Sequence, residues 1–148
     1  MNMDFWDADG LGAITLPMLL VAGDQDNISG YEQGVRAIYE QAGSRERYML
    51  IFKNGGHTVG APIPLPVEFL DRGPVEGASH YQDPVWDSVR SNNILQHFAT
   101  AFLDVHLKGD ESKRAYLDLA EDGLATGEAQ WKGFPEETAV GLKIYRSI

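Results

Sequence analysis

The chain has 148 residues, 43% of them hydrophobic and 23% charged, which is typical of a single globular domain with a buried core. Its formal net charge of −10 disfavours nucleic acid and anionic membranes as partners, because both are bound through basic surfaces. The absence of cysteine excludes disulfides, a thiolate nucleophile and thiolate-ligated zinc, and neither a membrane-spanning run nor a signal peptide is visible.

Two apolar runs predict two buried strands. The first covers residues 18–22 and follows Pro17, which is tolerated at the start of a strand because that residue need not donate to the ladder. The second covers residues 48–52 and ends in a glycine turn. Between them, apolar residues at spacings of three and four predict a helix that begins at residue 29 or 30 and ends near residue 41.

The expected ends of this helix are Ser29 as its cap and Gly43 as its stop. Strand, helix and strand within so short a stretch indicate a βαβ unit, and such units form parallel sheets with right-handed crossovers. The fold class expected from the sequence is therefore α/β, with residues 1–148 in one domain.

The second half of the chain predicts one long helix between less regular segments. Prolines punctuate residues 55–77, which we expect to form a long loop. A helix is expected from about Asp83 to Lys108, with Asp83-Pro84 as its start and Gly109 as its stop. Its expected apolar face comprises Trp86, Val89, Ile94, Phe98, Phe102 and Val105. Residues 111–148 are expected to form an irregular tail of short extended pieces and turns.

Asp26 and His57 are the candidate catalytic residues, because each follows the carboxyl end of a predicted strand. A histidine in that position can act as a general base, and a buried carboxylate can fix its tautomer and stabilise the imidazolium. Asp24 is the alternative acid. The simpler interpretation is that residues 23–27 form only a solvated turn and that His57 is a surface histidine in a glycine turn.

The order of these residues leads to a family resemblance. Residues 14–26 (ITLPMLLVAGDQD) resemble the segment that carries the catalytic acid in α/β-hydrolases, and residues 54–57 (NGGH) resemble the segment that carries their histidine. The predicted final helix is similar to the C-terminal helix that closes that fold. Within the superfamily, the chain most resembles bacterial proteins described as predicted dienelactone hydrolases, related to platelet-activating-factor acetylhydrolases. The resemblance covers roughly residues 14–109.

The resemblance implies the C-terminal part of an α/β-hydrolase, a parallel βαβ core with a long final helix. It also implies hydrolysis of a carboxylic ester or lactone through an acyl-enzyme, with Asp26 as acid and His57 as base. The chain contains no Gly-x-Ser-x-Gly elbow, so no nucleophile is assigned in it, and we expect the isolated chain to be inactive. The serines considered are Ser29, Ser44, Ser79, Ser88, Ser91, Ser112 and Ser147.

Metal binding is the rival chemistry, and the sequence does not favour it. A calcium loop that starts at Asp24 fails, because Ile28 and Val35 lie where ligands belong. His97 and His106 are nine residues apart, which places them on opposite faces of a helix. No metal or cofactor is therefore expected, and His80, before the final helix, is expected to be structural.

The expected partners are a small ester or lactone, bound by the full-length protein, and a second copy of the chain. The sheet of a complete α/β-hydrolase continues beyond the first strand, so the chain alone would leave an apolar edge that favours a homodimer or larger assembly. The alternative function is a non-catalytic binding or self-associating domain that keeps the hydrolase fold.

Overall fold

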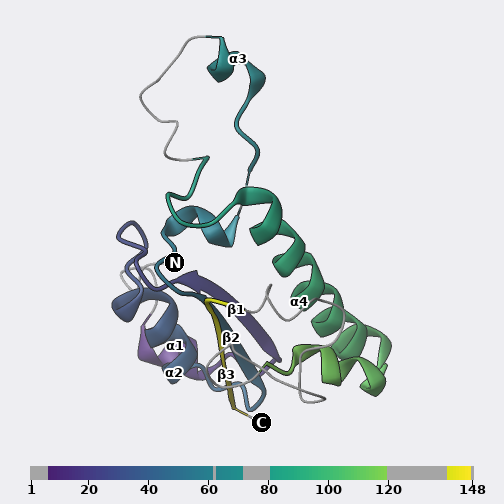
Figure 1. Ribbon diagram of the computed structural model, residues 1–148. Coiled ribbons are helices and arrows are strands. Elements are labelled where there is room, and N and C mark those ends of the chain that lie inside the picture. Colours follow the sequence, from purple (N-terminus) through teal and green to yellow (C-terminus); the bar gives the residue numbers. More distant parts are fainter. Residues whose placement is uncertain (1–6, 62, 72–80, 120–139, 148) are drawn as a thin grey trace.

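The structure, a computed structural model, describes residues 7–61, 63–71, 81–119 and 140–147. These residues form a mixed α/β arrangement that contains one sheet of three strands (Figure 1). Strands β1 (Met18–Gly23) and β2 (Arg47–Phe52) are parallel neighbours, and β3 (Leu142–Ser147) pairs antiparallel with the other side of β2. The two expected strands and their parallel pairing are thereby confirmed. β2 lies in the middle of the sheet and is buried as predicted, whereas the first four residues of β1 are only half-buried.

The connection between β1 and β2 is helical but starts later than expected. It consists of a π-helical turn, η2 (Glu32–Arg36), followed by helix α2 (Ala37–Gln41). Ser29 does not cap it, because no side chain caps η2. The glycine after α2 has another role, since a Cβ on Gly43 would lie 2.0 Å from the carbonyl oxygen of Gly12. Gly43 therefore lets the end of α2 approach the short helix α1 (Ala8–Gly12).

The long helix α4 (Ser88–Lys108) also begins later than expected. Its cap is Asp87, whose carboxylate accepts a hydrogen bond from the amide of Arg90, whereas the carboxylate of Asp83 is used elsewhere. The helix ends as predicted at Gly109, whose φ of 71° suits the left-handed C-terminal position. Val89 is exposed, so it does not belong to the apolar face.

The expected loop and tail contain regular segments. After β2 come a 3₁₀ helix, η3 (His57–Gly60), and a short helix, α3 (Val67–Leu70). The expected irregular tail is wrong in two places, because residues 111–117 form a 3₁₀ helix, η5 (Glu111–Leu117), and residues 142–147 form β3. Tail residues 120–139 and 148 lie outside the described residues.

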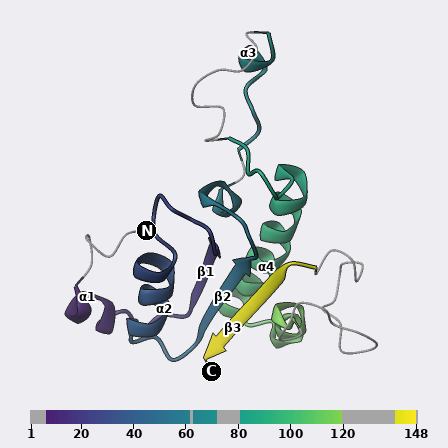
Figure 2. The ribbon, with the colours of Figure 1, turned by 60° about the vertical axis from the view of Figure 1, so that its left-hand side comes forward.

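The sheet is covered on both faces (Figure 2). α4 and η5 cover one face, where the core contains Tyr48, Leu50, Phe52, Ile94, Phe98, Val105, Leu117, Leu142 and Ile144. η2 and α2 cover the other face, where Ala22, Val35, Met49 and Ile51 are buried. This arrangement directs the carboxyl ends of β1 and β2 to the same edge of the sheet. Among the described residues, no helix is long and apolar enough to cross a membrane.

Candidate functional site

The turns that follow β1 and β2 pack directly against each other. A Cβ on Gly23 would lie 2.1 Å from the carbonyl oxygen of Gly55 and 2.5 Å from that of Gly56, so only glycine fits at this position. The amide of Gln25 donates to the carbonyl of Gly55 at 2.9 Å. Because backbone meets backbone here, the two turns hold each other in place and carry Asp26 and His57 with them.

Asp26 is buried and fully engaged. Its Oδ1 accepts hydrogen bonds from the amides of Ile28 and Ser29, each at 2.9 Å, and its Oδ2 lies 3.0 Å from Nδ1 of His57. Burial alone raises the pKa of Asp26, but the hydrogen bonds from His57 and the two amides outweigh burial and leave the pKa below its ordinary value. Asp26 is therefore a fixed carboxylate at neutral pH, aimed at the imidazole.

His57 opens η3, and 44% of its side chain is exposed. An Nδ1 that faces a carboxylate carries the hydrogen of the neutral ring, which leaves the lone pair on Nε2. Among the described residues, no hydrogen-bond partner of Nε2 is found. The imidazole therefore has one nitrogen oriented by Asp26 and the other available to accept a proton.

The loop that carries His57 is anchored from the start of the α4 segment. Oδ2 of Asp83 accepts a hydrogen bond from the amide of Gly56 at 2.6 Å, one residue before His57. Its Oδ1 accepts from the amides of Val85 and Trp86. The predicted role of Asp83 as the cap of the long helix is thus replaced by a contact that positions the histidine loop.

Asp24 does not contact His57. Its Oδ1 accepts a hydrogen bond from the amide of Asn54 at 2.6 Å, and Asn54 has the left-handed φ of 58°. This contact stabilises the turn after β2 and keeps the Asp24 carboxylate away from the imidazole. Of the two acids that the sequence proposes, the structure therefore brings only Asp26 to His57.

The sequence analysis did not predict that Ser29 lies beside His57. Its Oγ lies 3.3 Å from Nδ1 of His57, the same nitrogen that Asp26 contacts at the shorter distance of 3.0 Å. One ring nitrogen has either one hydrogen or one lone pair, so Ser29 and Asp26 compete for it. In this arrangement Ser29 is not positioned to give its proton to the free nitrogen. A serine in a polar turn carries no sequence signal for such a contact.

A cavity of about 420 Å³ opens beside the pair. Its lining combines Asp26, Ser29, His57 and Thr58 with apolar residues, namely Val21, Ala22, Val35, Ala61 and Ile63. Apolar walls with a few polar groups are typical of small-molecule sites. The larger groove of the molecule contains neither Asp26 nor His57, so we place the candidate site at the smaller cavity, where the chemical groups converge.

The other histidines remain apart from this site. Nε2 of His97 bonds the carbonyl oxygen of Tyr116 at 2.9 Å, and Nε2 of His106 lies 3.6 Å from the Glu46 carboxylate. His80 lies outside the described residues. Within the described part of the chain, no cluster of three or more histidine or acidic side chains could hold a metal ion.

No protein-family model, curated protein or solved structure matches the chain.

Proposed function

We propose that this chain supplies the acid–histidine pair of a carboxylic-ester or lactone hydrolase of the α/β-hydrolase type. The observation that carries the proposal is the 3.0 Å contact between Oδ2 of Asp26 and Nδ1 of His57. Both residues follow adjacent parallel strands, with the acid first in the chain and the histidine second. This order is the one found in α/β-hydrolases, where the nucleophile comes earlier still.

The geometry suits proton transfer through Nε2. A nucleophile that approaches the exposed side of His57 would give its proton to Nε2 while the hydrogen on Nδ1 stays bonded to Asp26. The imidazolium formed in that step would be stabilised by the Asp26 carboxylate. His57 would then return the proton to the leaving oxygen, and the apolar walls of the 420 Å³ cavity would accommodate the acyl part of a small neutral ester or lactone.

The nucleophile and the oxyanion hole would come from a part of the protein that precedes this sequence. The isolated chain should therefore hydrolyse p-nitrophenyl acetate only at the background rate, and His57→Gln should leave that rate unchanged, because triad residues act as a unit. The longer natural protein should react with a fluorophosphonate at a serine that precedes residue 1, or with iodoacetamide at a cysteine in that position.

Two substitutions in the longer protein test the roles of the pair. We expect His57→Gln and Asp26→Asn each to lower ester hydrolysis by about a thousandfold or more, whereas Asp24→Asn should have a much smaller effect. A natural protein that begins at Met1, or equal losses from the two aspartate substitutions, would contradict the proposal. Turnover by the isolated chain that His57→Gln abolishes would identify a nucleophile within it, with Ser29 as the first residue to test.

A second candidate function, a self-associating domain without catalysis, rests on the outer edge of β1. The amide of Met18 donates to Glu46, so alternation along the strand directs the peptide groups of Leu19 and Val21 away from β2. No described strand pairs with that side of β1, and Leu16 beside it is 75% exposed. The later part of β1 packs against η3, whereas the edge around Leu19 can pair with another chain. Association without hydrolysis in the longer protein would favour this second function.

A further inference from the structure

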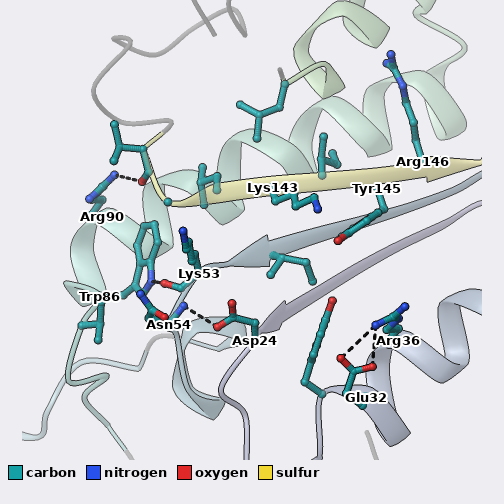
Figure 3. A pocket seen from close by; sticks show the side chains of 18 residues that line it. Asp24, Glu32, Arg36, Lys53, Asn54, Trp86, Arg90, Lys143, Tyr145 and Arg146 are labelled. Carbon is teal, nitrogen blue, oxygen red and sulfur yellow. Dashed lines mark hydrogen bonds and ion pairs between the residues drawn. The ribbon is translucent and has the colours of Figure 1, made fainter. Parts of the chain in front are cut away.

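A second cavity lies away from the catalytic candidates, along β3 and the neighbouring parts of β2 and η2. It is a groove of about 1410 Å³, and every residue from Val140 to Arg146 lines it (Figure 3). A groove of this volume, lined by seven consecutive residues, exceeds what a small molecule needs and suits an extended chain. β3 is an edge strand among the described residues, because it pairs only with β2.

The backbone of β3 offers hydrogen-bonding groups to this groove. The amide of Lys53 donates to the carbonyl of Gly141 at 2.8 Å, so the peptide groups of residue 141 face β2. Alternation in an antiparallel pair then directs the amides and carbonyls of Leu142, Ile144 and Arg146 outward. A peptide that runs beside β3 could pair with these groups as an added strand.

The groove is basic within an acidic protein. Five basic side chains line it against two acidic ones, although the whole chain has 12 basic and 22 acidic residues. The five are Arg36, Lys53, Arg90, Lys143 and Arg146. Arg36 pairs with Glu32 and Arg146 pairs with Asp118, whereas Lys53 and Lys143 form no ion pair with a described carboxylate. The two lysines are therefore available to an acidic partner.

The two faces of β3 present different surfaces to an added strand. Figure 3 shows Lys143 and Tyr145 on one side of β3, the side that also holds Lys53 and Asp24, and Arg146 on the other. The ammonium of Lys143 lies 4.5 Å from the centre of the Tyr145 ring. Elsewhere along the groove, Val85 and Val140 are exposed by 60% and 50%. One side thus carries Lys143 beside an aromatic ring, the other carries Arg146, and two exposed valines extend the lining beyond these side chains.

From these features we infer that the edge of β3 binds an extended acidic peptide in which carboxylate and apolar side chains alternate. Successive side chains of a strand point to opposite faces, so the acidic ones would meet Lys53 and Lys143 while the apolar ones would cover Val85 and Val140. The groove contains neither Asp26 nor His57, so this inference is independent of the proposed hydrolase site.

The test uses the whole chain and two fluorescein-labelled peptides of equal composition. One has three Val-Glu repeats followed by valine, and the other has its three glutamates in a central block between pairs of valines. Fluorescence anisotropy should show about tenfold tighter binding of the alternating peptide, with affinity falling as salt is added. N-methylation of those backbone amides of the alternating peptide that would face β3 should abolish binding, because it removes the hydrogen bonds to the strand.

Two charge-reversal variants and one control locate the site. Lys143→Glu and Lys53→Glu should each weaken binding of the alternating peptide by about tenfold, whereas Arg45→Glu, a change at an exposed arginine outside the groove, should leave it unchanged. Equal affinity for both peptides would overturn the inference, and so would equal effects of the three substitutions. If glutarate, at a carboxylate concentration equal to that of the alternating peptide, displaced this peptide, the groove would be a site for small anions and the inference would be overturned.

Discussion

The substitution Gly23→Ala tests whether the docking of two backbone turns maintains the candidate site. The new Cβ would lie 2.1 Å from the carbonyl oxygen of Gly55, and ordinary contact begins near 3.4 Å, so the turns must separate by about 1.3 Å. Backbone on both sides leaves no flexible side chain to move. We therefore expect a loss of about 3 kcal/mol of folding free energy, the upper end of the usual cost of overpacking. For a chain of this length, that loss corresponds to a Tm decrease of about 10 °C.

Urea denaturation and the ring ¹⁵N signals of His57 measure the two consequences. The matched control is Gly12→Ala, where a Cβ meets no atom within 4 Å and where alanine favours the helix. Gly12→Ala should be neutral or stabilising and should leave the His57 signals unchanged. Gly23→Ala should destabilise the chain and displace those signals. If the two variants had equal stability and identical His57 spectra, the account of the docked turns would be refuted.

Three further predictions concern the acid, the anchor of the histidine loop and assembly. The pKa of Asp26 in the folded chain lies below the ordinary value of 3.8, so the ionised carboxylate stabilises the fold above pH 3.8. This stabilisation is lost as the pH falls from 3.8 toward the lower pKa of the folded chain. Asp26→Asn should therefore lower the urea midpoint at neutral pH and reduce the fall of that midpoint as the solution is acidified. An unchanged fall of the midpoint in acid would contradict this prediction. Asp83→Ala and Asp87→Ala should each cost about 1–2 kcal/mol in urea denaturation, but only Asp83→Ala, which frees the amide of Gly56, should displace the His57 signals. We expect the chain to form a dimer through the edge of β1. Sedimentation equilibrium should show a species of twice the chain mass, and a single species at 16.3 kDa would exclude the dimer.

The sequence predicts the parts of the fold that local patterns determine. The continuous apolar runs of β1 and β2, bounded by Pro17 and by glycine turns, are sufficient to identify two parallel strands, although only β2 is buried along most of its length. Since the carboxyl ends of parallel neighbours lie at one edge, the meeting of Asp26 and His57 follows from their positions in the chain. The C-terminal end of α4 is likewise predictable, because Gly109 suits a left-handed stop.

The rest depends on contacts between distant segments. Asp83 has the pattern of a helix cap, but its carboxylate bonds the amide of Gly56, 27 residues earlier, and the helix starts four residues later than a cap at Asp83 would give. The pairing of β3 with β2 joins segments about 90 residues apart, which a short alternating pattern near the end of the chain does not reveal. Ser29 reaches His57 only because the two turns dock.

The most direct test of the central claim is the tautomer of His57, read from long-range ¹H–¹⁵N NMR spectra above the pH range in which imidazoles titrate. The account predicts a hydrogen on Nδ1, bonded to Asp26, and an unprotonated Nε2 that is free to act as a base. Asp26→Asn should weaken this preference, because the neutral amide is a poorer acceptor than the carboxylate. A hydrogen on Nε2, with Nδ1 accepting from the hydroxyl of Ser29, would contradict the account.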